Sequence, residues 1–138
     1  MVARADNEQH LRLLAIFHYV VAGFTALFAL FPLIHFAVGW FILHAPPPKT
    51  GEPPPAFVGW LFMALGAGFF LLGESFAACV VAAGRFIGAR RRYWFVFVMA
   101  CLQCGFFPFG TVLGVFTIVV LSRPSVKEMF GLTVSEQA

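Results

Sequence analysis

A chain of 138 residues in which 61% of the residues are apolar and only 11% are charged has more apolar side chains than a soluble domain of this size can bury. The mean hydropathy of +0.90 points the same way. The composition excludes an ordinary soluble protein and predicts an all-α integral membrane protein, with no shift that would mark a second domain. The net charge of +3 gains meaning only from where the basic residues lie.

Three apolar blocks follow a polar start that ends near Arg12. They cover residues 13–43, 57–84 and 93–121. Each is longer than the roughly 20 residues that cross a hydrocarbon core of about 30 Å. Tilt absorbs part of the excess length, and proline allows a helix to kink or turn because it lacks the backbone donor.

Two prolines stand inside these blocks. Pro32, in LFPLIHF, has no glycine beside it, which favours a kink within one span over a hairpin turn. Pro108 lies between Gly105 and Gly110, which favours a real turn between two short helices. The chain is therefore predicted to be one transmembrane domain over residues 1–138, a compact bundle of about four helices at residues 13–43, 57–84, 90–106 and 109–122.

The two loops carry different charges. Residues 85–92 hold Arg85, Arg90, Arg91 and Arg92, whereas the proline-rich residues 44–56 hold one lysine and one glutamate. Because short basic loops remain in the cytoplasm, the arginine loop and both termini are predicted to be cytoplasmic and the proline-rich loop extracytoplasmic. The four arginines are candidate ligands for anionic lipid headgroups. The proline-rich loop reads as a stiff connector, with a recognition motif as the alternative.

The first apolar block is too long for the apolar region of a signal peptide, so it is expected to remain as a span. It opens with HLRLLAIFHYVVAGFTALFALFPLIH, and the chain closes with FPFGTVLGVFTIVVLSRPSVKEMF. With the arginine loop between them, these segments resemble a group of small multi-span bacterial membrane proteins. The resemblance implies a bacterial membrane protein and carries over no activity or site residue. The predicted location is the bacterial cytoplasmic membrane.

Glu74 is the only acidic residue within an apolar block. It lies about ten residues from the arginine loop, so the helical rise places it roughly 15 Å below that loop and near the middle of a membrane. A carboxyl there costs energy. One interpretation is a proton or cation site. The other is a neutral carboxyl that is hydrogen-bonded to Ser75 or to a neighbouring helix.

His18 and His35 lie on the first span, and imidazole can ligate haem or a chlorophyll-type pigment. They are 17 residues apart, which is about 25 Å along one helix, so they cannot share a metal unless Pro32 makes a hairpin. Phe31, one turn before His35, is large where a flat macrocycle needs a small neighbour. No cofactor and no metal site are predicted, and pigment binding stays an alternative.

Cys101 and Cys104 have the spacing of thiol redox motifs. Only Cys79 remains to relay electrons, and an apolar surrounding disfavours a thiolate. The cysteines therefore read as small buried apolar side chains. Gln103 is expected to form a hydrogen bond between helices.

Gly110 and Gly114 place two positions without side chains on one helix face, and Thr111 can bond a carbonyl. This arrangement is suited either to packing inside the bundle or to a dimer seam. Similar small pairs occur elsewhere in the chain. They are Ala22 and Ala26, Ala64 and Gly68, and Gly73 and Ala77.

The chain has no glycine loop for phosphate, no loop set of serine, histidine and acid, and no zinc-spaced cluster outside its apolar blocks. Enzymatic activity and nucleic-acid binding are not expected. The leading hypothesis is an accessory or assembly subunit that associates with itself or with a larger membrane complex. A small proton- or ion-coupled transporter or channel centred on Glu74 is the alternative, and a haem- or pigment-binding subunit is the third hypothesis.

Overall fold

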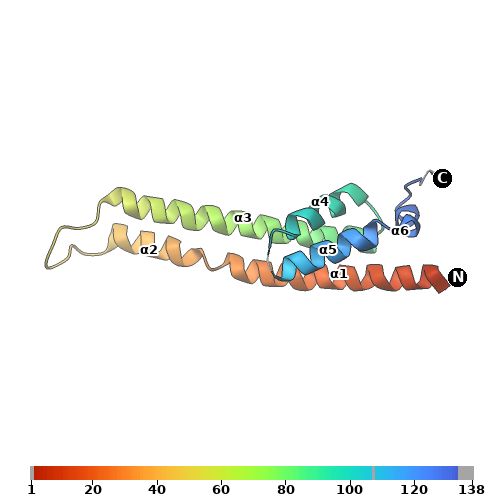
Figure 1. Ribbon diagram of the computed structural model, residues 1–138. Coiled ribbons are helices and arrows are strands. Elements are labelled where there is room, and N and C mark those ends of the chain that lie inside the picture. Colours follow the sequence, from red (N-terminus) through yellow and green to blue (C-terminus); the bar gives the residue numbers. More distant parts are fainter. Residues whose placement is uncertain (1, 107, 134–138) are drawn as a thin grey trace. The chain divides into compact units, whose positions relative to one another are not determined.

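The computed structural model describes residues 2–106 and 108–133 (Figure 1). Every regular element within them is a helix, so the all-helical prediction is confirmed for this part of the chain. The helices are α1 (Val2–Ala29), α2 (Leu33–His44), α3 (Ala56–Gly88), α4 (Tyr93–Gln103), α5 (Phe109–Leu121) and α6 (Pro124–Met129). Phe107, in the predicted turn before α5, lies outside the described residues.

Two helical segments are long and apolar enough to cross a membrane, Arg4–His44 and Ala56–Gly88. The helices α4 and α5 have 11 and 13 residues. At 1.5 Å per residue they are about 16 and 20 Å long, which is shorter than a hydrocarbon core of about 30 Å. Neither can cross a bilayer by itself, and the four-span bundle stays a prediction.

The chain divides into two compact units, with boundaries inside α1 and inside α3. Among the described residues, the first unit contains residues 2–23, 78–106 and 108–133. The second unit contains residues 24–77. Each unit has its own packing.

The break near Pro32 is one turn long. The helix α1 ends at Ala29 and α2 begins at Leu33. Hydrogen bonds between residues three apart, as in a 3₁₀ turn, bridge the gap. The amide of Phe31 donates to the Phe28 carbonyl at 3.1 Å, and the amide of Leu33 donates to the Leu30 carbonyl at 3.0 Å. The carbonyl of Phe28, which Pro32 cannot reach with a donor, is thereby satisfied.

The chain keeps its direction through this break. Three glycines of α3 face successive positions along the opposite segment, namely Gly73 at Ala29, Gly66 at Pro32 and Phe36, and Gly59 at Gly39. A hairpin at Pro32 would reverse that order. The second unit is therefore a pair of antiparallel helical segments joined by the proline-rich loop, which has no helix or strand between Ala45 and Pro55.

The first unit contains the main apolar core. Leu14 of α1, Ile87 of α3, Val96 of α4 and Leu121 of α5 are all fully buried or nearly so. Val126 of α6 joins the same cluster, so the short last helix packs against the others. Four helices and the start of α1 thus share one core at this end of the chain.

Candidate functional site

The closest backbone contacts in the second unit form a glycine seam, which we define as Gly59, Gly66 and Gly73 of α3. A Cβ atom at residue 66 would lie 2.5 Å from the Phe36 amide nitrogen. One at residue 73 would lie 2.6 Å from the Ala29 Cβ. No real side chain tolerates such distances, so glycine allows the two helical segments to approach.

The glycine seam has an exact seven-residue spacing that extends along α3 to Val80 and Ile87, both fully buried in the first unit. A seven-residue repeat keeps one face of a helix turned to a partner. Pairs of small residues four apart in the sequence do not reveal this seam. The signal that could have found it is the repeat of glycine every seventh residue.

Ala64 and Gly68 lie on a different face of α3 from the glycine seam. Ala64 is exposed, and no atom lies within 4 Å of a Cβ built on Gly68. In contrast, Gly73 faces Ala29 and Ala77 is buried. Among the small pairs noted in the sequence, Ala64 and Gly68 therefore leave a shallow notch that the described chain does not fill.

Gly110 and Gly114 face α4 of the same chain. A Cβ at residue 110 would meet the Gln103 carbonyl oxygen at 2.6 Å, and one at residue 114 would meet the Ala100 carbonyl oxygen at 2.5 Å. The Thr111 hydroxyl donates to the Cys104 carbonyl at 2.8 Å. Since residues later in α5 meet residues earlier in α4, the two helices form an antiparallel hairpin.

Glu74 follows the last glycine of the seam and is partly buried in the second unit. Neither a hydrogen bond nor an ion pair joins it to any of the described residues, and Ser75 beside it is exposed. His35 is exposed on its unit and its ring stacks on Phe62 at 6.0 Å. Phe62 lies 12 residues from Glu74, about 18 Å along α3, so Glu74 and His35 do not form one site.

His18 is fully buried in the first unit, where Gly84 makes room for it. Its Nδ1 bonds the Leu14 carbonyl at 2.8 Å, and its Nε2 has no hydrogen-bond partner in the described part of the chain. Gln103 of α4 is also fully buried, and neither atom of its side-chain amide has a hydrogen-bond partner among the described residues. Pigment ligation stays an untested alternative, for which the His35 ring is the more accessible of the two imidazoles.

The three cysteines are free thiols. The Cys104 thiol donates to the Ala100 carbonyl at 3.2 Å, whereas Cys101 is exposed on α4. Within the described residues, no group of three or more histidine, cysteine, aspartate or glutamate side chains could hold a metal ion.

The arginine loop closes α3 with an unusual cap. Arg90 has a positive φ of 53°, and the Arg91 amide donates back to the Phe86 carbonyl at 2.9 Å. This is the arrangement that usually selects glycine after a helix. The Arg92 guanidinium lies over the Phe86 ring at 5.3 Å, and Arg90 pairs with Glu8 at 2.9 Å. Arg85 is exposed in the last turn of α3.

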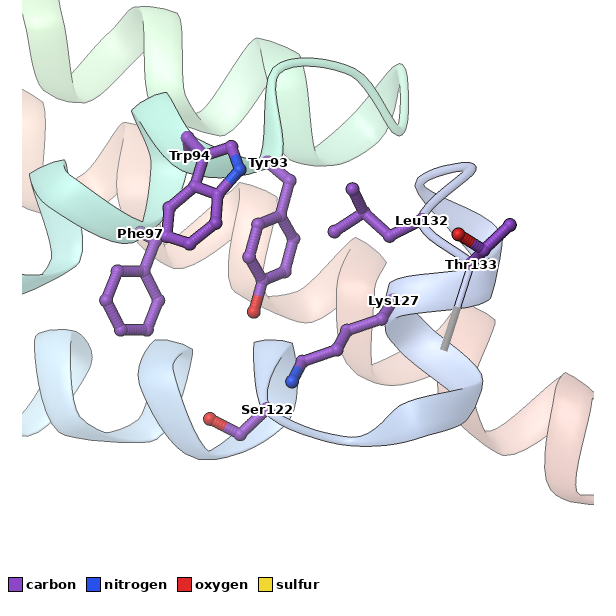
Figure 2. Close-up of a pocket in the computed structure, with 7 residues that line it drawn as sticks. All are labelled: Tyr93, Trp94, Phe97, Ser122, Lys127, Leu132 and Thr133. Carbon is purple, nitrogen blue, oxygen red and sulfur yellow. The ribbon is translucent and has the colours of Figure 1, made fainter. Parts of the chain in front are cut away.

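Sequence reasoning did not find the aromatic groove, an open pocket of about 490 Å³ in the first unit (Figure 2). Its lining comes from the start of α4, the end of α5, α6 and the segment that follows. The lining residues are Tyr93, Trp94, Phe97, Ser122, Lys127, Leu132 and Thr133. Because the lining residues are up to 40 residues apart in the sequence, no local motif indicates the groove.

Tyr93 organises the aromatic groove. Its hydroxyl donates to the Leu121 carbonyl at 2.9 Å, which ties the start of α4 to the end of α5. Its ring packs against Trp94 edge-on at 5.8 Å and against Phe97 at 6.2 Å. Figure 2 shows Lys127 extending from α6 toward the side on which Ser122 lies, below the Tyr93 ring.

Comparison of the chain with protein families, with curated proteins and with solved structures finds no match. The resemblance to small bacterial membrane proteins therefore stays a prediction.

Proposed function

We propose that this chain is an integral membrane protein that acts as a non-enzymatic accessory or assembly subunit, by associating with copies of itself or with a larger membrane complex. The observation that carries the proposal is how little of its apolar surface the chain covers. Only 11% of the most apolar window of each long helical segment is buried. In water each exposed Å² of apolar surface costs about 25 cal/mol, whereas in lipid it costs nothing.

The exposed apolar side chains are large and lie along both segments of the second unit. Phe28 and Phe41 on one segment and Leu72 on the other are each more than two-thirds exposed. Lipid tails or a partner helix would cover such surfaces equally well, since both are apolar. We infer that the protein lies in the cytoplasmic membrane, with the arginine loop on the cytoplasmic side, because short basic loops remain in the cytoplasm.

The Ala64 and Gly68 notch is the preferred contact for association. Close approach of two helices in lipid needs small residues on an outward face. Gly66 and Gly73 contact the opposite helical segment of the same chain, whereas no atom lies within 4 Å of a Cβ built on Gly68. A second helix could therefore approach α3 at Gly68 without disturbing the glycine seam.

Native mass spectrometry of protein extracted gently from its host membrane tests this function. We expect either a defined homo-oligomer or a defined complex with other proteins. A protein that remains a single free chain at every concentration and in every mild detergent would contradict the proposal. Strong solubility in water without detergent would contradict its membrane location.

The contact is tested by substitution of Gly68→Leu, which fills the notch and should lower the association constant at least tenfold. Gly23→Leu is the matched control. A Cβ at Gly23 also meets no atom within 4 Å, but its neighbours one turn away, Tyr19 and Leu27, are large and exposed. Equal effects of the two substitutions would place the contact elsewhere.

A second candidate function is a proton or ion pathway that uses Glu74. The observation that favours it is a partly buried carboxyl in an apolar helix without a partner among the described residues. Proton flux into liposomes that contain the purified protein, abolished by Glu74→Gln, would support this function. Flux that survives the substitution, or no flux at all, would exclude Glu74 as its centre.

A further inference from the structure

The aromatic groove joins an apolar wall to a basic side chain. Tyr93, Trp94 and Phe97 supply the wall, and Trp94 is 69% exposed. Lys127 supplies the charge, and it forms no ion pair with any described residue. Glu128, its neighbour in sequence, is exposed and is not bonded to it. A cation beside an open aromatic surface fits a ligand that is both anionic and apolar.

The groove lies at the basic end of the first unit. Three contacts hold this end together, since Asn7 bonds Ser125, Glu8 pairs with Arg90 and Tyr93 bonds the Leu121 carbonyl. Among the described residues of this unit, eight are basic and three are acidic, and they fall at the start of α1, around the loop after α3, and between α5 and residue 128. The potential at the groove is therefore positive.

The polar atoms in the groove are suited to a phosphate. The Lys127 ammonium carries three donors and the Thr133 hydroxyl one. The Ser122 hydroxyl donates to the Ile118 carbonyl at 2.7 Å, so its proton is already engaged within the chain. Lys127 and Thr133 therefore offer the donors that an anion needs.

The position of the groove also matches a membrane interface, which rests on the membrane location in the proposed function. Tryptophan and tyrosine are enriched where headgroups meet acyl chains, and lysine is enriched on the cytoplasmic side. Both helices of the α4 and α5 hairpin, which begins and ends at this groove, are apolar along their length. A lipid that stands beside it would present its phosphate to Lys127 and its acyl chain to Trp94 and Phe97.

We propose that the aromatic groove binds one anionic phospholipid. Lys127 and Thr133 hold its phosphate, and the part of an acyl chain nearest the headgroup packs on Trp94 and Phe97. The site is distinct from the diffuse attraction of the arginine loop for anionic membranes. It selects for negative charge through Lys127 and for an acyl chain through the aromatic wall.

Native mass spectrometry of the full chain in neutral detergent tests the site, with dioleoyl phosphatidylglycerol and dioleoyl phosphatidylcholine as probes. We expect one phosphatidylglycerol molecule to be retained more strongly than phosphatidylcholine. Lys127→Gln should weaken phosphatidylglycerol binding about fivefold and leave phosphatidylcholine binding unchanged. Trp94→Ala should weaken the binding of both lipids, because it removes the apolar contact and leaves the charge in place.

Arg91→Gln is the matched control, since Arg91 is an exposed cation at the same end that does not line the groove. It should reduce phosphatidylglycerol binding far less than Lys127→Gln does. Equal losses for the two variants would overturn the site in favour of diffuse attraction. Retention of phosphatidylglycerol by Lys127→Gln at the level of the unaltered protein would overturn it as well.

A separate measurement distinguishes failure of this site from failure of the proposed function. Flotation with pure phosphatidylcholine vesicles after alkaline extraction reports membrane insertion without any anionic lipid. If the unaltered protein floats but Lys127→Gln still binds phosphatidylglycerol as strongly as it does, the site is wrong and the membrane location stands. A protein that does not float fails the membrane location, and the lipid site fails with it.

Discussion

Gly66 on α3 lies directly against the backbone of Phe36 on α2, so that a Cβ atom at residue 66 would be 2.5 Å from the Phe36 amide nitrogen. This contact is the middle of the glycine seam. Because backbone atoms cannot move aside as a side chain can, the seam depends on the absence of a side chain at this position.

Gly66→Ala is therefore expected to lower the free energy of unfolding by about 1 to 3 kcal/mol, because the added methyl forces the helices apart. Titration with sodium dodecyl sulfate in mixed micelles, followed by tryptophan fluorescence, measures the change. Gly68→Ala is the control, since residue 68 is open and alanine favours a helix over glycine by about 1 kcal/mol. Equal losses at the two positions would contradict the seam.

Thr111→Val should lower the free energy of unfolding by about 1 kcal/mol, because it removes the hydroxyl that donates to the Cys104 carbonyl at 2.8 Å. That bond satisfies a carbonyl in the turn between α4 and α5, where the helical ladder is interrupted. Thr111→Ser keeps the hydroxyl and should restore most of the stability. A valine variant as stable as the parent would show that this bond does not hold the turn.

Gln103→Met is expected to raise the free energy of unfolding by about 1 kcal/mol, since the amide atoms of this fully buried side chain have no partners in the described structure. Thr117→Val serves as the contrast and should lower stability, because the Thr117 hydroxyl donates to the Leu113 carbonyl at 2.7 Å. The same unfolding titration measures both. A loss of stability in Gln103→Met would contradict the view that the buried amide costs stability.

Glu8→Gln should change the free energy of unfolding by less than about 0.5 kcal/mol, although Glu8 pairs with Arg90 at 2.9 Å. The side chains are 49% and 39% exposed, so solvent screens their attraction. Measurements at low and at high salt check the small effect. A loss of 2 kcal/mol would mean that the pair is shielded, for instance by lipid or by a second subunit.

Thr50→Cys in a variant without the native cysteines tests the predicted orientation. An impermeant maleimide should label residue 50 on intact spheroplasts, because the proline-rich loop is predicted to be extracytoplasmic. Ser125→Cys in the same background should be labelled only after the membrane is opened. The reverse pattern would invert the topology, and labelling of both from outside would exclude the cytoplasmic position of the C-terminal segment.

The sequence by itself determined the helical class and the principal breaks in the chain. Apolar blocks of this length form helices, and proline interrupts their hydrogen bonds, so Pro32, the proline-rich loop and Pro108 all mark helix ends. These are local effects that need no neighbours. The neighbouring residues favoured a kink at Pro32 and a turn at Pro108, but only the contacts of α3 and α4 show that the chain continues past the first and reverses at the second.

Only the tertiary structure decided which small residues meet a neighbour. When a helix is apolar on all sides, periodicity does not identify its inner face. Ala64 and Gly68 therefore looked equivalent to Gly73 and Ala77 in the sequence, although Gly68 is open and Gly73 is in contact with Ala29. The same reason hid the aromatic groove, because Lys127 and Trp94 meet only after α4, α5 and α6 have packed.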